Sequence, residues 1–247
     1  MTDQPAGIGQ IDVAILAGGL GTRIRGVLGD TPKVLAPIHC NGGARPFLDI
    51  LLNWLSREGV RRVVLCLGHL ADRVIDHLRA VPRSDLLAIS SIVEPRPLGT
   101  AGALRFAAAH LTSDPVMVVN GDTLVDADLG SLLAHHHASG AAATMLCVRV
   151  ADAGRYGRVA IDDRGRIIRF IEKDPGAGAG VINAGIYLLG RATMAQIAAG
   201  RGGSIERDFL ETAPSGTIAT VVTVGRFIDI GTPESLDAAQ QVLAGPT

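Results

Sequence analysis

Residues 13–33 read VAILAGGLGTRIRGVLGDTPK, an apolar run followed at once by a glycine-rich loop. The run is short and apolar throughout, which is typical of a strand buried on both faces of a sheet. The glycines leave backbone N–H groups free to approach an anion, and Arg23, Arg25 and Lys33 supply positive charge nearby. The stretch therefore predicts an α/β protein in which a strand ends in a phosphate-binding loop.

Short apolar runs alternate with amphipathic stretches through the first 120 residues. We expect further strands, also buried on both faces, at 62–67, 87–93 and 116–120, and helices in the stretches 46–59, 70–81 and 101–111. This alternation predicts a parallel sheet with right-handed crossovers.

After about residue 140 the pattern changes to strand-like runs in close succession. These runs are residues 144–150, 157–162, 166–172, 182–189 and 220–231, and the turn at 162–165 joins two of them as a hairpin. A last helix is expected at 232–244, with Thr232 as its cap. No linker-like segment separates the two halves, so we expect one mixed α/β domain over residues 1–247.

The composition excludes several classes of partner. The formal net charge is −1, so neither nucleic acid nor an anionic membrane would attract the chain at long range. No apolar run reaches the roughly 18 residues that a membrane span needs. Cys40, Cys66 and Cys147 form no paired or metal-binding motif, and we therefore expect buried thiols in a cytoplasmic protein.

Three kinds of phosphate loop can follow a strand in this way. The Walker motif is absent, because Thr31 and Pro32 precede Lys33. The dinucleotide fingerprint is incomplete, because Ile24 stands where its third glycine belongs. Several cations around free backbone donors suit a triphosphate best. A plain glycine turn with solvated arginines is the alternative.

The strings LAGGLGTRIRG (16–26) and TPKVLAPI (31–38) resemble the signature of the sugar-1-phosphate nucleotidylyltransferases, and further blocks follow in order up to residues 231–234. The resemblance implies a Rossmann-like, mixed and mainly parallel sheet flanked by helices, the glycosyltransferase-A-like nucleotidyltransferase fold. It also implies attack of a sugar 1-phosphate on the α-phosphorus of a nucleoside triphosphate, with release of pyrophosphate. The nucleotide-binding part would span about residues 11–140 and the sugar-binding part about 141–247.

The resemblance places the nucleotide against the glycine loop and two later segments. The residues expected to bind it are Leu16, Ala17, Gly18, Gly19, Gly21, Thr22, Arg23, Lys33, Glu94, Pro97, Leu98, Gly99, Thr100, Gly121 and Asp122. Arg23 and Lys33 are also expected to act in catalysis. Residues 99–100 open a helix, whose amides could face the base and ribose. Glu94 favours guanine, because a carboxylate only accepts hydrogen bonds and guanine offers two adjacent donors; a backbone carbonyl is the alternative acceptor.

Asp122 and Asp229 are each expected at the end of a strand. Two carboxylates beside a triphosphate form the oxygen site that Mg²⁺ prefers, and the resemblance implies this pair as metal ligands and Mg²⁺ as cofactor. An aspartate that only turns the chain is the alternative for either residue. Asp126 and Asp128 fit that alternative better, and we leave them out of the site.

The resemblance implies Glu172, Lys173, Asn183 and Gly185 as the residues that bind the sugar phosphate. Lys173 would bind the phosphate as a mobile point charge, and the other three would contact sugar hydroxyls. A solvated hairpin end is the alternative for Glu172 and Lys173.

Within this family the chain resembles in particular the bacterial D-glycero-D-manno-heptose 1-phosphate guanylyltransferases, through LGTAGAL (98–104) and INAGIY (182–187). This implies GTP and that heptose 1-phosphate as substrates, and it places SIERDFL (204–210) over the sugar. Val34 and the inserted IHCNGGARPF (38–47) depart from the pattern.

Two other functions are also compatible with the sequence. One is a hexose or N-acetylmuramate 1-phosphate uridylyl-, thymidylyl- or guanylyltransferase, because few contacts set base and sugar specificity. Another is a non-catalytic binding homologue, against which the set of charged residues argues (Arg23, Lys33, Asp122, Lys173 and Asp229). A homo-oligomer is compatible with the sequence.

Overall fold

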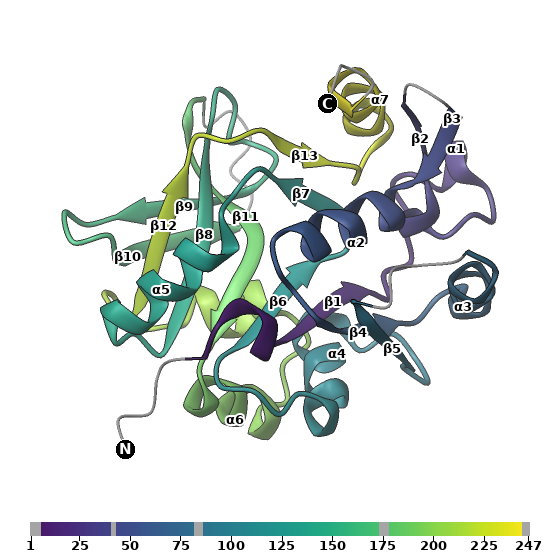
Figure 1. The fold of residues 1–247 in the computed structure, drawn as a ribbon. Coiled ribbons are helices and arrows are strands. Elements are labelled where there is room, and N and C mark those ends of the chain that lie inside the picture. The colour runs from purple at the N-terminus through teal and green to yellow at the C-terminus, as the bar shows by residue number, and fades with distance from the viewer. Residues whose placement is uncertain (1–5, 41–42, 82–85, 173–177, 244–247) are drawn as a thin grey trace.

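A computed structural model of the chain describes residues 6–40, 43–81, 86–172 and 178–243. Its centre is a mixed sheet, to which the first half of the chain contributes four parallel strands in the order β5–β4–β1–β6 (Figure 1). These strands are β1 (Asp12–Ala17), β4 (Arg62–Leu67), β5 (Ala88–Val93) and β6 (Val116–Asn120). The predicted parallel half of the fold is therefore confirmed.

Strand β1 shows why its residues are apolar without alternation. Val13 and Ile15 pack into one core cluster, and Ala14 packs into a second cluster on the other face of the sheet. Successive side chains of a strand point to opposite faces, so a strand covered on both sides must be apolar at every position. β5 was wrongly expected to be buried in the same way, because it lies at the edge of the sheet and is largely exposed.

Strand β11 (Gly180–Leu189) joins the two halves of the sheet. It runs antiparallel to β6 on one side and to β8 (Ala143–Val150) on the other. β12 (Ile218–Thr223) lies parallel to β8, and the predicted hairpin is formed by β9 (Gly157–Ile161) and β10 (Ile167–Glu172). The single mixed sheet expected from the sequence is confirmed.

The expectation of one strand over 220–231 was wrong. The chain forms β12 and then β13 (Phe227–Asp229), which leaves the main sheet to pair with β7 (Thr123–Val125). The break occurs where the chain passes close to Asp126 at Gly225. A Cβ at Gly225 would lie 2.0 Å from the Asp126 carbonyl oxygen. Only glycine permits this close crossing, and across it the chain changes its pairing partner from β8 to β7.

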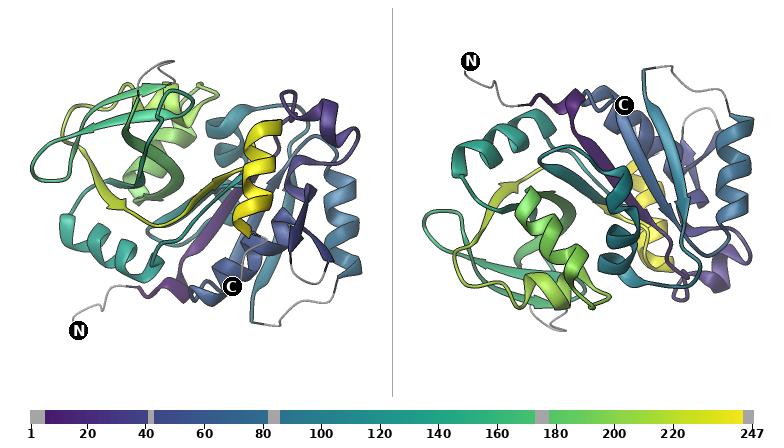
Figure 2. Two further views of the ribbon diagram at one scale, coloured as in Figure 1. Left: turned by 90° about the horizontal axis from the view of Figure 1, so that it is seen from above. Right: turned by 90° about the horizontal axis from the view of Figure 1, so that it is seen from below.

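Helices flank both faces of the sheet. They are α1 (Arg25–Leu28), α2 (Phe47–Arg57), α3 (Ala71–Ala80), α4 (Gly99–Ala107), α5 (Leu129–Ser139), α6 (Arg191–Ala199) and α7 (Pro233–Leu243). Helices α4 and α6 pack on the face that includes Ala14, whereas α2, α3, α5 and α7 contribute to the other cluster. Figure 2 shows α7 on the side seen from above and α6 on the side seen from below.

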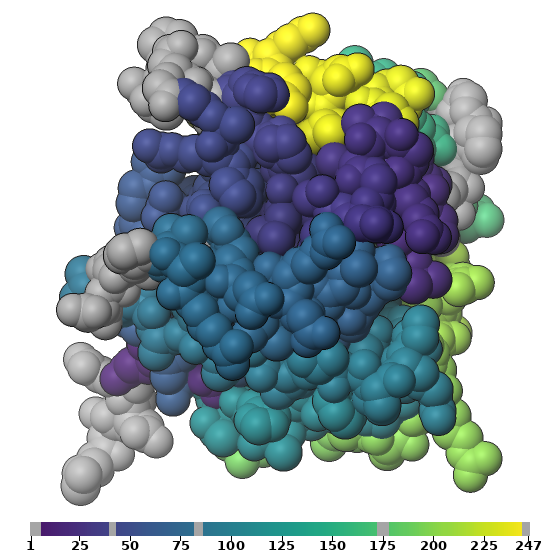
Figure 3. Space-filling view, turned by 90° about the vertical axis from the view of Figure 1, so that its right-hand side faces the viewer, coloured from purple at the N-terminus to yellow at the C-terminus, as the bar shows by residue number. Residues whose placement is uncertain are grey.

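The inserted segment forms a short hairpin of β2 (Pro37–Cys40) and β3 (Gly43–Pro46). Gln240 of α7 holds the hairpin, because its Nε2 donates to the Pro37 carbonyl at 2.9 Å and its Oε1 accepts from the His39 amide at 2.7 Å. In the space-filling view, α7 in yellow borders the purple and indigo surface of the N-terminal segments (Figure 3). Among the described residues, no helix is long and apolar enough to cross a membrane.

Candidate active site

Strands β1 and β6 end side by side, and this brings the glycine loop against Asp122. Leu16 lies opposite Asn120 in the parallel ladder, and the Gly121 amide donates to the Leu16 carbonyl at 2.9 Å. A Cβ at Gly121 would lie 2.7 Å from that same oxygen, so the close approach requires glycine. Asp122 therefore follows directly at the carboxyl end of the sheet, where open α/β sheets bind ligands.

A cavity of about 270 Å³ lies at this edge and collects most of the residues predicted to bind the nucleotide. Those that line it are Leu16, Ala17, Gly18, Gly19, Gly21, Lys33, Glu94, Pro97, Gly99, Thr100, Gly121 and Asp122. Leu20, Val34, Ala103 and Asn120 also line it and were not predicted. Thr22, Arg23 and Leu98 do not line it. We refer to this cavity as the loop pocket.

Glu94 is held against the glycine loop by backbone contacts. Its Oε2 accepts a hydrogen bond from the Leu98 amide at 3.3 Å. A Cβ on Gly18 would lie 3.0 Å from Glu94 Oε1, and a Cβ on Gly68 would lie 2.7 Å from it. Glu94 therefore packs closely against both glycines. Burial raises the pKa of Glu94, while the Leu98 amide lowers it. Burial and the nearby Glu94 charge together raise the pKa of Cys66 to about 12.

The start of α4 is hydrogen-bonded to residues 203–206, a contact that was not predicted from the sequence. The Ala101 amide donates to the Gly203 carbonyl at 3.0 Å, so this amide does not face the loop pocket as a free donor. Thr100 Oγ1 accepts from the Ile205 amide at 2.8 Å and donates to Glu206 Oε2 at 3.0 Å. Residues 203–206 therefore support the helix end at which the base and ribose were expected.

Asp122 and Asp229 are brought together by the β7–β13 pair. Asp229 lies opposite Thr123, and the Ile230 amide donates to the Asp122 carbonyl at 3.0 Å. Asp229 Oδ1 accepts from the Gly231 amide at 2.7 Å, and its side chain is only 13% exposed. Burial, and next the charge of Asp122, raise the pKa of Asp229. The charges of the two carboxylates thus repel each other.

Lys33 compensates part of this negative charge. Its ammonium donates a hydrogen bond to Asp122 Oδ2, and both side chains are less than one third exposed. The departure at Val34 is accommodated in the core, because Val34 is buried within the short 3₁₀ turn Lys33–Leu35. Val34 therefore leaves Lys33 fixed beside Asp122.

A second cavity, of about 160 Å³, lies on the other side of Asp122. We call it the aspartate pocket, and its lining consists of Arg23, Asn120, Asp122, Thr123, Arg155, Tyr156, Gly157, Asn183, Gly185, Glu206, Phe227 and Asp229. Asn120 and Asp122 line both cavities. Arg23, which we expect to bind the nucleotide, thus lines this pocket and not the loop pocket.

Of the residues expected at the sugar phosphate, Asn183 and Gly185 line the aspartate pocket. Glu172 is the last residue of β10, and Lys173 lies outside the described residues. A bulge in β11 sets the other two, because the register against β8 shifts between Asn183 and Ile186. Gly185 has φ +77°, and its amide donates to Asn183 Oδ1 at 2.9 Å.

Several residues of the aspartate pocket were not predicted, among them Arg155, Tyr156 and Phe227. Arg155 Nη2 donates to Thr232 Oγ1 at 2.8 Å and lies 4.0 Å from Asp229 Oδ2. Tyr156 is hydrogen-bonded to Asp229, and burial followed by the Asp229 charge raises the pKa of the tyrosine. The Tyr156 ring packs edge-on against Phe227, with centroids 5.4 Å apart. The sequence marked them only by position, because Arg155 and Tyr156 directly precede β9 and Phe227 is the first residue of β13.

Comparison with known proteins gives a match over almost the whole chain. A family described as nucleotidyl transferase matches residues 13–244. The chain belongs to the nucleotidyl transferase family. A chain named D-glycero-alpha-D-manno-heptose 1-phosphate guanylyltransferase, from Aneurinibacillus thermoaerophilus, is 32% identical, and the match covers 94% of this chain and 98% of that one.

Two further relatives of this nucleotidyl transferase were compared. A putative mannose-1-phosphate guanyltransferase from Sulfolobus acidocaldarius is 35% identical over 90% of this chain, but the chain spans only 60% of that relative's length. The crystal structure of HddC from Yersinia pseudotuberculosis complexed with GMP-PN has a TM-score of 0.81 and 34% identity, and the match covers 94% of this chain and 99% of that chain. The resemblance read from the sequence, and the fold that it implied, are confirmed.

The aspartate pair of this family member is suited to a hard cation. Carboxylate oxygens are the ligands that Mg²⁺ prefers. Burial and next the Asp122 charge raise the pKa of Asp229, and a dication would offset both effects. Within the described segments, no group of three or more Asp, Glu, His or Cys side chains is placed to hold a metal. Phosphate oxygens and water would therefore complete the coordination shell.

Proposed function

We propose that the protein transfers a nucleoside monophosphate from GTP to a sugar 1-phosphate, D-glycero-D-manno-heptose 1-phosphate, and releases pyrophosphate. The observation that carries the proposal is the position of Asp122, which lines both the loop pocket and the aspartate pocket. A nucleotide in the first cavity and a sugar phosphate in the second would meet at this carboxylate. The family membership supports the same class of reaction.

The residues around Asp122 suit an in-line displacement. The backbone of the glycine loop and Lys33 would hold the triphosphate, and Arg23 would face the reacting phosphates from the aspartate pocket. Mg²⁺ held by Asp122 and Asp229 would supply positive charge to the phosphates. Glu172 and Lys173 stay, as the resemblance implied, our proposed contacts of the sugar phosphate. No side-chain nucleophile is needed, because a phosphate oxygen of the sugar 1-phosphate is already anionic.

Guanine is the base that the loop pocket favours. Glu94 lines this pocket with its carboxylate fixed between two glycines and the Leu98 amide. An ionised carboxylate can accept both N1–H and the 2-amino group of guanine. The names of the relatives, which are guanylyltransferases of mannose 1-phosphate or of a heptose 1-phosphate, support this choice of base.

Mannose 1-phosphate is the second candidate for the sugar substrate. Relatives named for mannose 1-phosphate and for the heptose 1-phosphate are similarly identical to this chain, at 35% and 32%. The aspartate pocket is lined by Asn183, Gly185 and Glu206, and these stay our proposed contacts of the sugar. We favour the heptose because the sequence blocks at 98–104 and 182–187 follow that group. Buried free thiols at Cys66 and Cys147 support the expected cytoplasmic location.

A substrate screen tests the proposal directly. Pyrophosphate release would be measured with GTP, UTP, dTTP, CTP and ATP against heptose, mannose, glucose and N-acetylmuramate 1-phosphates, with Mg²⁺ present. We expect the highest kcat/KM for GTP with the heptose phosphate. A preference for a pyrimidine nucleotide would overturn the base, and a preference for mannose 1-phosphate would overturn the sugar. Asp122→Asn and Asp229→Asn variants that kept full activity, or a covalent nucleotidyl-enzyme intermediate, would overturn the mechanism.

A further inference from the structure

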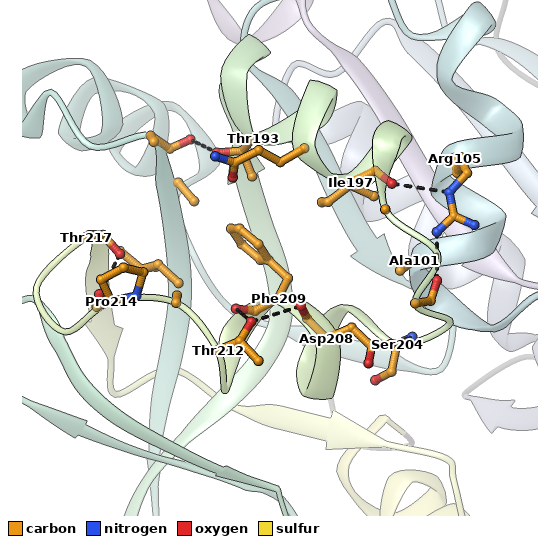
Figure 4. Close-up of a pocket in the computed structure, with 17 residues that line it drawn as sticks. Ala101, Arg105, Thr193, Ile197, Ser204, Asp208, Phe209, Thr212, Pro214 and Thr217 are labelled. Atoms are coloured by element: carbon orange, nitrogen blue, oxygen red, sulfur yellow. Dashed lines mark hydrogen bonds between the residues drawn. The ribbon is translucent and has the colours of Figure 1, made fainter.

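A further cavity of the described residues lies outside both substrate pockets. It has a volume of about 440 Å³ and is enclosed by α4, α6, the segment 200–214 and the start of β12 (Figure 4). Ala101, Ile197 and Phe209 form much of its apolar wall, and the Phe209 ring points into the space between α6 and the 212–217 segment. This volume lies in the range of small-molecule sites, at roughly 300–1,000 Å³.

Several polar groups of this cavity already have hydrogen-bond partners within the protein. The hydroxyls of Thr193, Thr212 and Thr217 donate to backbone carbonyls at 2.7 to 2.9 Å. Arg105 donates through Nε to the Ile197 carbonyl at 3.2 Å and through Nη2 to the Gly202 carbonyl at 2.7 Å. At these groups a ligand would therefore find mainly methyl, aliphatic and aromatic surface rather than free donors.

One turn of the chain forms a wall of this cavity and a wall of the aspartate pocket. It is the π-helical turn Glu206–Leu210, a type of turn that often occurs at functional sites. Asp208 and Phe209 line the cavity, whereas Glu206 lines the aspartate pocket. Glu206 Oε2 accepts from Thr100 Oγ1 at 3.0 Å, and Thr100 lines the loop pocket. A displacement of this turn would therefore reach both substrate pockets.

The backbone packing leaves little room for independent movement. A Cβ at Gly99 would lie 2.1 Å from the Gly203 carbonyl oxygen, so these two segments touch backbone to backbone. A Cβ at Gly202 would lie 2.5 Å from the Asp208 side chain. Segment 202–208 is thus packed between the cavity and the start of α4, and it cannot shift without moving one of them.

We propose that this cavity is a regulatory site for an uncharged, mainly apolar molecule of one to three rings. Its occupation shifts the turn Glu206–Leu210 and changes the affinity of the aspartate pocket for the sugar phosphate. The effect on sugar phosphate affinity rests on the proposed function, whereas binding of the apolar molecule in the cavity does not.

The test uses N-phenyl-1-naphthylamine, an uncharged three-ring probe whose fluorescence rises in apolar surroundings. We expect saturable binding of one molecule per chain, about tenfold or more tighter than for 8-anilino-1-naphthalenesulfonate, its anionic analogue. Ala213→Phe fills the cavity and is expected to abolish binding, whereas Ala195→Phe on the exposed side of α6 keeps it. If Ala213→Phe unfolds, Thr217→Phe at the rim replaces it. Absent binding, or equal binding in the filled variant, would overturn the site.

Coupling is measured without turnover. Because coupling between two sites is reciprocal, saturating heptose or mannose 1-phosphate should change the dissociation constant of the probe about fivefold or more. An unchanged constant in a preparation that catalyses transfer would overturn the regulatory role. If the preparation shows no transfer while the probe still binds and the filled variant does not, the proposed function fails and the cavity site stands.

Discussion

Asp229 lies directly opposite Thr123 in the antiparallel pair of β13 and β7. This pairing brings Asp229 close to Asp122, because the amide of the next residue, Ile230, donates to the Asp122 carbonyl at 3.0 Å. The pairing of β13 with β7 and the hydrogen bond from Ile230 to Asp122 therefore place Asp229 near the end of β6. The site is built by strand pairing, and side-chain contacts refine it.

The aspartate pair is expected to control metal binding. Asp122→Asn and Asp229→Asn should each lower Mn²⁺ affinity, measured by electron paramagnetic resonance, and lower kcat/KM by at least about 10- to 100-fold, the range seen when only outer-shell partners are removed. Asp126→Asn is the matched control, because Asp126 pairs with Arg226 at 2.7 Å and lines neither substrate pocket. Equal Mn²⁺ affinity in all three variants would contradict the proposed metal site.

Gly185 is expected to tolerate no side chain. Its φ is +77°, and a Cβ would lie 2.8 Å from both Asn120 Nδ2 and Thr123 Oγ1. Gly185→Ala should therefore destabilise the protein by about 1–3 kcal/mol and also reduce kcat/KM, because the displaced groups line the aspartate pocket. Urea unfolding and steady-state kinetics check the two effects.

Gly165 is the control for this substitution. It also has a positive φ, of +72°, but a Cβ there would meet only Thr220 at ordinary contact distances of 3.6 Å or more. Gly165→Ala should cost roughly 1–2 kcal/mol of backbone strain and leave kcat/KM unchanged. A loss of activity equal to that of Gly185→Ala would show that strain alone, and not the site, explains the effect.

The sequence predicted the fold well because buried parallel strands leave a local signature. The run at 13–17 is apolar at every residue, and both faces of β1 are indeed covered. The edge position of β5 and the break at Gly225 could not be seen, since each depends on which distant segment lies alongside. The hydrophobic pattern of a segment indicates whether the segment is buried, but it does not indicate which other segments lie beside it.

The same limit applies to the site. Asp122 and Asp229 were predicted because both follow strands, and strand ends gather at one edge. Arg155 and Tyr156 were missed because they stand in a loop, and only the fold brings them to Asp229. The contact of Gly203 with the start of α4 was missed for the same reason.

Asp12 is expected to stabilise the fold without a role in the site. It is 4% exposed, and its Oδ2 accepts from the amides of Thr112 and Ser113 at 2.6 and 2.9 Å, while Oδ1 lies 3.1 Å from Arg62 Nε. Asp12→Ala would leave the two amides without their acceptor, at a cost of about 1–3 kcal/mol in unfolding free energy.

Urea titration measures the loss, and Asp76→Ala is the control. Asp76 is 76% exposed and lies 3.8 Å from Arg79, so its removal should cost about 0–1 kcal/mol. The KM for each substrate should be unchanged in folded Asp12→Ala, since Asp12 lines neither pocket. A cost for Asp12→Ala no larger than that for Asp76→Ala would contradict the assignment.

Glu94 is expected to make nucleotide binding depend on pH. Burial raises the pKa of Glu94, so its protonated form appears at a pH where an ordinary glutamate is still ionised. The ionised form accepts both guanine donors, and GTP affinity should therefore be full above the raised pKa and fall as the pH is lowered through it. Calorimetric titration of GTP at several pH values measures this decline.

Glu94→Gln separates this effect from other titrating groups. Glutamine keeps the shape of the side chain but presents one acceptor and one donor group, so it mismatches guanine, and GTP should bind about 10- to 100-fold more weakly, as expected for a lost charged hydrogen bond. The pH dependence that Glu94 contributes should vanish in this variant, because glutamine does not titrate. UTP binding should change much less, since uracil presents a donor beside acceptors. Retention of both wild-type GTP affinity and its pH profile would show that another group reads the base.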